Sequence, residues 1–179
     1  SWKRGLGGRL NRDVAIALME KEHELIDSPG FAMVYQWLLS GGKTAFLQDA
    51  NSLVMKTPNL VEVVSYLKET FPGLKRITSY ARSSTLARKS VEELRQLKAA
   101  GLNRIHVGLE SGSDAVLSYV KKGVTAAQQI EGGRRVVDAG IELSEYVMPG
   151  LGGRRLSREH ALETARVLNA INPDFIRIR

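Results

Sequence analysis

The 179-residue sequence contains no cysteine, and aromatic residues make up only 6% of it. Without cysteine the chain can form no disulfide and can supply no thiolate ligand to a metal. No apolar run approaches the roughly 20 residues that a membrane-spanning helix needs. The N-terminal stretch SWKRGLGGRLNRD carries basic residues with no apolar segment behind them, so it is not a secretory signal. These absences favour a cytoplasmic protein that does not bind a membrane.

Basic residues outnumber acidic ones by 26 to 19, which gives a net charge of +7. Such an excess suits an anionic partner such as nucleic acid, phosphate or an acidic metabolite. The basic residues are scattered, however, and they are not interleaved with aromatic residues. That distribution is typical of a solvated surface, so nucleic acid is a possible partner that the pattern does not favour.

Short runs typical of β-strands alternate with longer helical segments. The strands recur at intervals of roughly thirty residues, the size of one βαβ unit. We expect them at 43–48, 76–81, 104–109, 141–148 and 174–179. This alternation predicts an α/β fold with a parallel sheet and right-handed crossovers. Residues 1–42 are less regular, and we expect them to form an N-terminal helical segment that packs on the domain of residues 43–179.

Several helix starts are legible from their capping residues. Ser90 and Thr125 each stand three residues before a Glu or Gln, the pattern of a capping box. Thr57, before a proline, and Ser157 are also expected to cap helices. Ser113 is expected to cap the helix that follows it, whatever else its segment does.

Polar residues stand at the end of every predicted strand. Because the carboxyl ends of parallel strands gather at one edge of the sheet, a ligand site is expected there. Carboxylates can accept from an ammonium or from ribose hydroxyls, and basic side chains can hold a carboxylate. The candidate binding residues are Gln48, Asp49, Ala50, Asn51, Ser79, Arg82, Glu110, Ser111, Lys122, Glu145, Met148 and Gly150.

Each of these features also has a structural explanation. Asp49 could form an Asx turn that leaves a strand, and the glycines at 150–153 could form a plain turn. His106 and His160 have no ligand partner at a useful spacing, so both are expected to be structural. The repetition of polar residues at successive strand ends favours an active site over these separate explanations.

Three segments together resemble the core of the radical S-adenosylmethionine (SAM) enzymes. They are FLQDANSL at 46–53, HVGLESGSDAVL at 106–117 with KKG at 121–123, and EYVMPGLGG at 145–153. The resemblance is closest to the branch with the methylthiotransferases, the Elongator-type tRNA-modifying proteins and the coproporphyrinogen dehydrogenases. It covers residues from about 43 to 179. It implies a partial parallel (β/α) barrel in which strands two to six are present and the first is missing.

In that family three cysteines after the first strand hold a [4Fe–4S] cluster that binds SAM. The cluster, reduced by a ferredoxin or flavodoxin, cleaves SAM to a 5′-deoxyadenosyl radical that abstracts hydrogen from the substrate. The present sequence has no cysteine, so the resemblance implies a fragment that lacks the cluster motif, with a degenerate, cluster-free relative as the less favoured alternative. In either case the chain is expected to be inactive alone. We therefore assign no catalytic residue and no metal ligand to this chain.

The resemblance also assigns roles to positions in this sequence. Residues 48–51 fall where the family has a Gly-Gly-Glu segment at the SAM amino group. Ser79 and Arg82 fall at the end of the next strand. Glu110 and Ser111 match a polar pair expected near the ribose or methionine portion.

The remaining positions complete the implied SAM site. Lys122 stands where a basic residue meets the SAM carboxylate. Glu145 and the segment from Met148 to Gly153, which includes Gly150, match the family's fifth strand, which lines the adenosine side.

Two other functions are compatible with the residues. One is a non-catalytic α/β module that binds an anionic metabolite or RNA through a basic surface. The other is an ordinary (β/α) barrel enzyme with a phosphate site at 150–153, although such barrels usually have about 250 residues and eight strands. The substrate class, whether tetrapyrrole, tRNA base or small metabolite, is not indicated.

Overall fold

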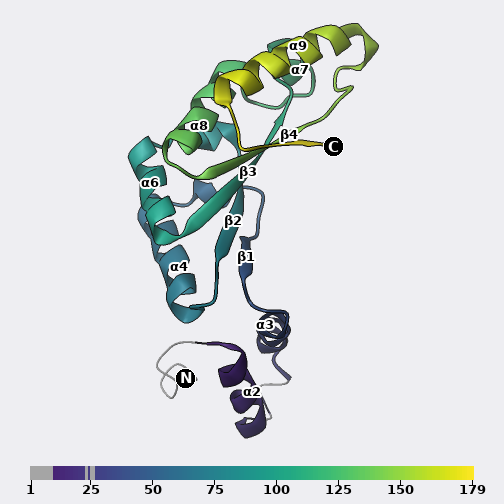
Figure 1. Ribbon diagram of the computed structural model, residues 1–179. Helices are drawn as coiled ribbons and strands as arrows, with labels where there is room; N and C mark the ends of the chain where they lie inside the picture. Colours follow the sequence, from purple (N-terminus) through teal and green to yellow (C-terminus); the bar gives the residue numbers. More distant parts are fainter. Residues whose placement is uncertain (1–9, 23, 25–26) are drawn as a thin grey trace.

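The structure, a computed structural model, describes residues 10–22, 24 and 27–179 (Figure 1). Its centre is a five-stranded sheet in which the strands follow one another in chain order. All four neighbouring pairs are parallel. The strands are β1 (Thr44–Leu47), β2 (Arg76–Ala81), β3 (Leu102–Glu110), β4 (Glu142–Val147) and β5 (Phe175–Ile178). The sheet does not close, so the predicted partial parallel α/β barrel is confirmed.

Helices connect the strands and lie along one side of the sheet (Figure 1). The crossovers are built from α4 (Thr57–Thr70), α6 (Val91–Ala100), α8 (Ala126–Asp138) and α9 (Gly153–Ile171). Shorter elements at the strand ends are η2 (Ser52–Val54), α5 (Ser83–Leu86) and α7 (Asp114–Tyr119). The main core lies between these helices and the sheet.

The alternation of side chains along β3 and β4 determines what each face of the sheet carries. Ile105, Val107 and Leu109 of β3 are fully buried in the core on the helix side. The intervening residues of β3 must therefore lie on the opposite face. We call that face, which carries Phe46, Tyr80, His106 and Tyr146 in contact with one another, the open face.

Three of the predicted helix caps are confirmed. Ser90 and Thr125 both form complete capping boxes, with reciprocal bonds to the third helical residue. The Ser113 side chain accepts from the Val116 N–H at 3.2 Å. Local sequence is sufficient at these positions because both partners lie within one turn.

Two predicted caps are wrong. Helix α4 begins at Thr57 itself, and the Thr57 hydroxyl donates to Glu93 Oε1 at 2.7 Å while it accepts from Lys89 Nζ at 2.8 Å. These tertiary partners take the place of the cap. Helix α9 begins at Gly153, four residues before Ser157, because the Arg-Arg-Leu segment between them consists of good helix formers.

The N-terminal region contains α2 (Arg12–Lys21) and α3 (Pro29–Leu39). They enclose a small separate core of Leu10, Ala15, Leu18 and Leu38. Trp37 reaches the sheet: its indole N–H donates to the Thr44 carbonyl at 2.8 Å, and its ring meets the Phe71 ring edge-on at 5.0 Å.

The predicted N-terminal segment 1–42 includes residues 1–9, 23 and 25–26, which lie outside the described residues. Within the described ranges, no helix has both the length and the apolar character needed to cross a membrane.

Candidate functional site

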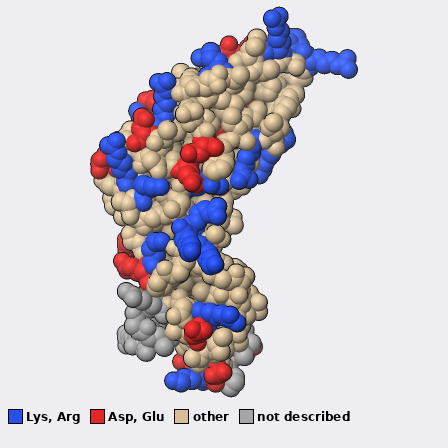
Figure 2. Space-filling view, viewed as in Figure 1, with Lys and Arg blue, Asp and Glu red and all other residues tan. Residues whose placement is uncertain are grey.

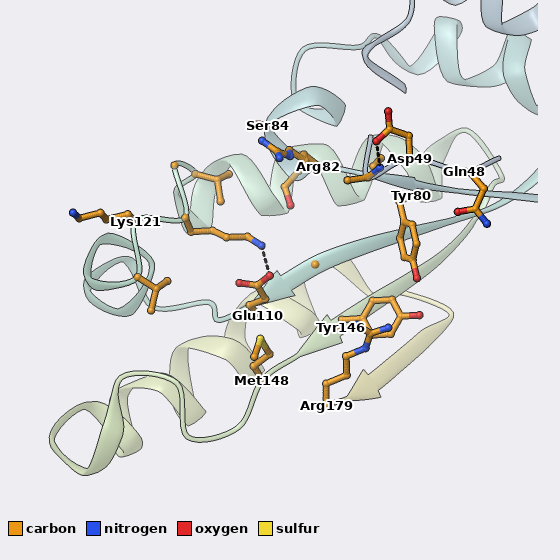
Figure 3. Close-up of a pocket in the computed structure, with 18 residues that line it drawn as sticks. Gln48, Asp49, Tyr80, Arg82, Ser84, Glu110, Lys121, Tyr146, Met148 and Arg179 are labelled. Atoms are coloured by element: carbon orange, nitrogen blue, oxygen red, sulfur yellow. Dashed lines mark hydrogen bonds and ion pairs between the residues drawn. The ribbon is translucent and has the colours of Figure 1, made fainter. Parts of the chain in front are cut away.

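A cavity of about 910 Å³ lies at the carboxyl ends of the strands (Figure 3). The strand ends therefore converge as the parallel sheet predicts. Seven of the predicted binding residues line it, and they come from the last residue of β3, from the loops after β1, β2 and β4 and from the turn after α7. They are Gln48, Asp49, Ala50, Arg82, Glu110, Lys122 and Met148.

Glu110 occupies the tip of β3 in an unusual backbone conformation. Its φ is +62°, in the left-handed region that side chains other than glycine rarely adopt. The pairing of β3 with β4 is irregular between Gly108 and Glu110, and such bulges redirect side chains. Here the carboxylate turns into the cavity and forms an ion pair with Lys122 (Figure 3).

Gly108 provides the space for this ion pair. A Cβ at position 108 would lie 3.1 Å from Glu110 Oε1 and 3.3 Å from Lys122 Nζ. Both distances are tighter than ordinary packing, so any side chain there would displace the charged groups. The glycine two residues before Glu110 therefore belongs to the site.

Asp49 places a second carboxylate in the same cavity. Its φ is +84°, and its Oδ1 accepts from the Ala50 N–H at 2.7 Å. Asn51 lies beside the cavity and joins two strand ends: its Oδ1 accepts from the Arg82 N–H at 3.1 Å and its Nδ2 donates to Thr85 Oγ1 at 2.9 Å. Asn51 thus fixes the β1 loop relative to the β2 loop.

Ser111, directly after Glu110, is buried and points away from the cavity. Its Oγ lies 2.8 Å from His160 Nδ1, and His160 Nε2 lies 3.1 Å from the Met148 carbonyl. A carbonyl can only accept, so Nε2 carries a proton and donates to the Met148 carbonyl. His160 therefore holds the end of β3 against the end of β4, the structural role that the sequence predicts.

Gly112 brings the same loop into direct contact with α9. Its N–H donates to Thr164 Oγ1 at 2.9 Å, and a Cβ at this position would lie 2.7 Å from the Thr164 Cα. Ser113 adds a bond to Glu159 Oε1 at 2.6 Å. The Ser-Gly-Ser sequence is therefore explained by close docking of the loop on a helix.

Three other predicted residues lie outside the cavity. Ser79 and Glu145 each stand two residues from core residues of their strands, so they face the helices with them, and both are buried. Burial raises the pKa of Glu145 to about 8, and its Oε2 has no hydrogen-bond partner among the described residues. Gly150 lies in the loop after β4 with a φ of +81°.

The cavity also contains residues outside the predicted binding set. Tyr80, Tyr146 and Arg179 line its open-face side, and Lys121 lines its rim. The two tyrosines lie within strands rather than after them. The sequence signal that could have identified them is the alternation of side chains along β2 and β4, which puts Tyr80 and Tyr146 on the face of the sheet opposite the core.

Charges of both signs lie around the cavity. Asp49 and Glu110 face a set of basic residues, Arg82, Lys121, Lys122 and Arg179. Elsewhere on the viewed face Lys and Arg are spread among Asp and Glu (Figure 2). Such a cavity suits a zwitterionic ligand.

Metal ligands are not part of this arrangement. Within the described portion of the chain no group of three His, Cys, Asp or Glu residues could hold a metal ion. The full sequence has no cysteine, so these residues do not fit a thiolate-ligated iron–sulfur cluster.

Comparison with known proteins places this site in context. A family model described as the Radical SAM superfamily matches residues 20–167. A tRNA uridine(34) acetyltransferase from Methanocaldococcus jannaschii is 24% identical over 88 residues, or 49% of this chain and 16% of that protein. The matched region is thus a small part of that relative.

Two solved structures share the fold. The Elp3 protein of Methanocaldococcus infernus superposes with a TM-score of 0.62 at 16% identity, over 83% of this chain and 40% of that one. Coproporphyrinogen III oxidase (HemN) from Escherichia coli, described as a radical SAM enzyme, superposes with a TM-score of 0.61 at 15% identity, over 76% and 31%. At these identities the likeness establishes the architecture.

Proposed function

The chain belongs to the radical SAM superfamily, and on that premise we propose that it forms the SAM-binding portion of a radical SAM enzyme. The observation that carries the proposal is the Glu110–Lys122 pair at the end of β3, inside the cavity that also receives Asp49 and Arg82. The amino-acid end of SAM has an ammonium and a carboxylate side by side. A ligand of that kind matches both members of the pair.

Each lining residue then has a defined role in binding. Glu110 accepts from the SAM ammonium or a ribose hydroxyl, and Lys122 donates to the carboxylate. Asp49 supplies a second acceptor near the positive end of the ligand. The left-handed conformations of Asp49 and Glu110 hold the two acids in place before the ligand arrives.

Residues beside the cavity contribute to binding through the groups that they position. Asn51 and Ser111 fix the loops that carry Asp49 and Glu110. Ser79, Glu145 and Gly150 complete the segments from which the lining residues project. Their proposed part in SAM binding is to hold those lining residues in place.

The reaction of the superfamily is the reductive cleavage of SAM to a 5′-deoxyadenosyl radical by a [4Fe–4S] cluster, followed by hydrogen abstraction from a substrate. The 179 residues supply no thiolate for that cluster, so we assign no step of the cleavage to them. We propose that this chain alone is inactive and that the substrate and a ferredoxin- or flavodoxin-type reductant are partners of the complete enzyme.

Isothermal titration calorimetry with SAM tests the binding proposal. We expect the chain to bind SAM and the variants Glu110→Gln and Lys122→Met each to bind about tenfold more weakly, because each removes one charge-assisted hydrogen bond. Glu92→Gln, at an exposed acid of α6 that pairs only loosely with Arg95 at 3.9 Å, serves as the control. No SAM binding by the unaltered chain, or equal affinities for Glu110→Gln and Glu92→Gln, would overturn the proposal.

A further inference from the structure

Four rings from four neighbouring strands lie in contact on the open face of the sheet, and the Phe46 ring also lies 5.9 Å from the His106 ring. Phe46, Tyr80, His106 and Tyr146 come one each from β1, β2, β3 and β4. Successive centroids lie 4.9, 5.8 and 6.0 Å apart, within the range of aromatic contacts. Phe46, Tyr80 and Tyr146 are half-buried. We call these four residues the aromatic row.

Two residues of the aromatic row lie at the cavity, on the open face of the sheet. Tyr80 and Tyr146 line the same cavity as Glu110 and Lys122. Along β3, His106 precedes Glu110 by four residues, which corresponds to about 13 Å of strand. Gly108 lies between them and adds no side chain. The cavity, of about 910 Å³, reaches from Glu110 and Lys122 to Tyr80 and Tyr146, and we place a second ligand at the tyrosine side.

Positive charge lies at one end of the aromatic row. The Arg179 guanidinium lies 4.4 Å from the centroid of the Tyr146 ring, and that of Arg177 lies 5.9 Å from it. Neither arginine forms an ion pair with any acid of the described residues. The nearby Arg104, by contrast, is paired with Glu142 at 2.7 Å. Arg177 and Arg179 are thus the cations available to a ligand at this end.

His106 adds a polar but uncharged group to the centre of the row. Its Nδ1 is buried and has no hydrogen-bond partner among the described residues. Burial, together with Arg177 and Arg104, lowers the pKa of His106. The imidazole is therefore neutral at pH 7, and the positive charge facing a ligand comes from the arginines alone.

We propose that the aromatic row, with Arg177 and Arg179, binds the substrate of the enzyme, and that this substrate carries a flat aromatic ring with an anionic phosphate or carboxylate group. This inference rests on the proposed function, because it places the substrate beside SAM. Rings supply faces for stacking. Guanidinium groups bind phosphate or carboxylate and also stack on rings. Tyr146 and Arg179 together provide both kinds of contact.

Calorimetry in the presence of saturating SAM tests this inference with simple probes. Uridine 5′-monophosphate combines a ring with a phosphate, and benzene-1,3-dicarboxylate combines a ring with carboxylates. Uridine and inorganic phosphate provide each half alone. We expect at least one combined probe to bind about tenfold more tightly than either half, and the tighter of the two identifies the anionic group.

Matched variants show whether the probe occupies the proposed site. Tyr146→Leu and Arg179→Gln should each weaken the combined probe about tenfold. Tyr119→Leu and Arg154→Gln, at exposed positions on α7 and α9 that do not line the cavity, should leave its affinity unchanged. Thermal unfolding of each variant confirms that it is folded.

Three results would overturn the inference. They are displacement of the combined probe by SAM, equal affinity for inorganic phosphate and the combined probes, and equal losses from Tyr119→Leu and Tyr146→Leu. If SAM binds and no ring-bearing anion does, the inference fails and the proposed function stands. If a ring-bearing anion binds and SAM does not, the proposed function fails and the aromatic row remains a ligand site.

Discussion

Substitution of Gly112 by alanine should destabilise the fold, because this glycine touches α9 through its backbone. The new Cβ would lie 2.7 Å from the Thr164 Cα and 2.8 Å from the Glu163 carbonyl carbon, nearer still to that carbonyl's oxygen. Ordinary carbon contacts lie near 3.5 Å or beyond, so α9 or the loop must move by about 1 Å. Both sides of the contact are backbone, and neither can rotate away.

The structure allows the size of the effect to be estimated. Forcing an extra carbon into packed surroundings costs about 1–3 kcal/mol. The movement also weakens the buried hydrogen bond from the Gly112 N–H to Thr164 Oγ1, which contributes about 1 kcal/mol. We therefore expect Gly112→Ala to lower the free energy of unfolding by about 3 kcal/mol.

Urea denaturation followed by circular dichroism measures this loss, and Gly73→Ala is the matched control. A Cβ at Gly73 would meet no atom of the described chain within 4 Å, so we expect its free energy of unfolding to change by less than about 0.5 kcal/mol. Equal urea midpoints for the two variants would refute the close docking of the Ser111–Ser113 loop on α9.

Three further predictions concern the site and its pH dependence. Gly108→Ala should weaken SAM binding in calorimetry while the urea midpoint changes little, because the new Cβ meets the Glu110 and Lys122 charged groups. Glu145, whose pKa burial raises to about 8, binds its proton more tightly in the folded than in the unfolded state. The free energy of unfolding should therefore fall by a few kcal/mol between about pH 5 and pH 8, and urea midpoints of Glu145→Gln should lack this fall. Anaerobic reconstitution with iron and sulfide should leave the cysteine-free chain without bound iron and without SAM cleavage, as metal analysis and product chromatography would show; retained iron would contradict this.

The fold could be predicted closely from the sequence because its signals are local and repeated. The expected strand at 76–81 matches β2, and the other four agree with the structure to within two residues at each end. Capping boxes at Ser90 and Thr125 needed only neighbours in the chain. Thr57 shows the limit of this reasoning, since the hydrogen-bond partners of its hydroxyl, Lys89 and Glu93, lie more than thirty residues away in the chain.

The candidate site could be located from the sequence, but its lining could not be fully resolved. Asp49 and Glu110 could be predicted as site residues from the sequence, because acids at the ends of parallel strands meet at one edge of the sheet. Successive side chains of a strand point to opposite faces of the sheet. Tyr80 and Tyr146 therefore lie on the open face, whereas their neighbours Ser79 and Glu145 lie on the helix side. The core positions of β2 and β4 determine which residues face the helices, and this alternation would have assigned the two tyrosines to the opposite face. The Ser111–His160 contact joins residues 49 positions apart, and nothing in either local sequence specifies it.

The backbone at Glu110 offers a separate test of whether this residue is kept for binding rather than for stability. A non-glycine residue in the left-handed region costs about 1–2 kcal/mol, whereas glycine in an ordinary conformation is about 0.5–1 kcal/mol less stable than alanine. At a φ of +62° the first effect should exceed the second. We therefore expect Glu110→Gly to be at least as stable as Glu110→Ala in urea, although neither binds SAM well.

The same pair of substitutions at Glu92, in the first turn of α6, provides the control, and there glycine should be less stable than alanine because the backbone has an ordinary helical conformation. Both variants at position 110 lose the partly exposed ion pair with Lys122, which contributes little to stability, so their difference isolates the backbone effect. If the glycine variant at position 110 is less stable than the alanine variant by as much as at position 92, the conformation of Glu110 is not strained. With strain present, the carboxylate stands at a position where glycine would be as stable, which is the outcome that the proposed role of Glu110 in SAM binding predicts.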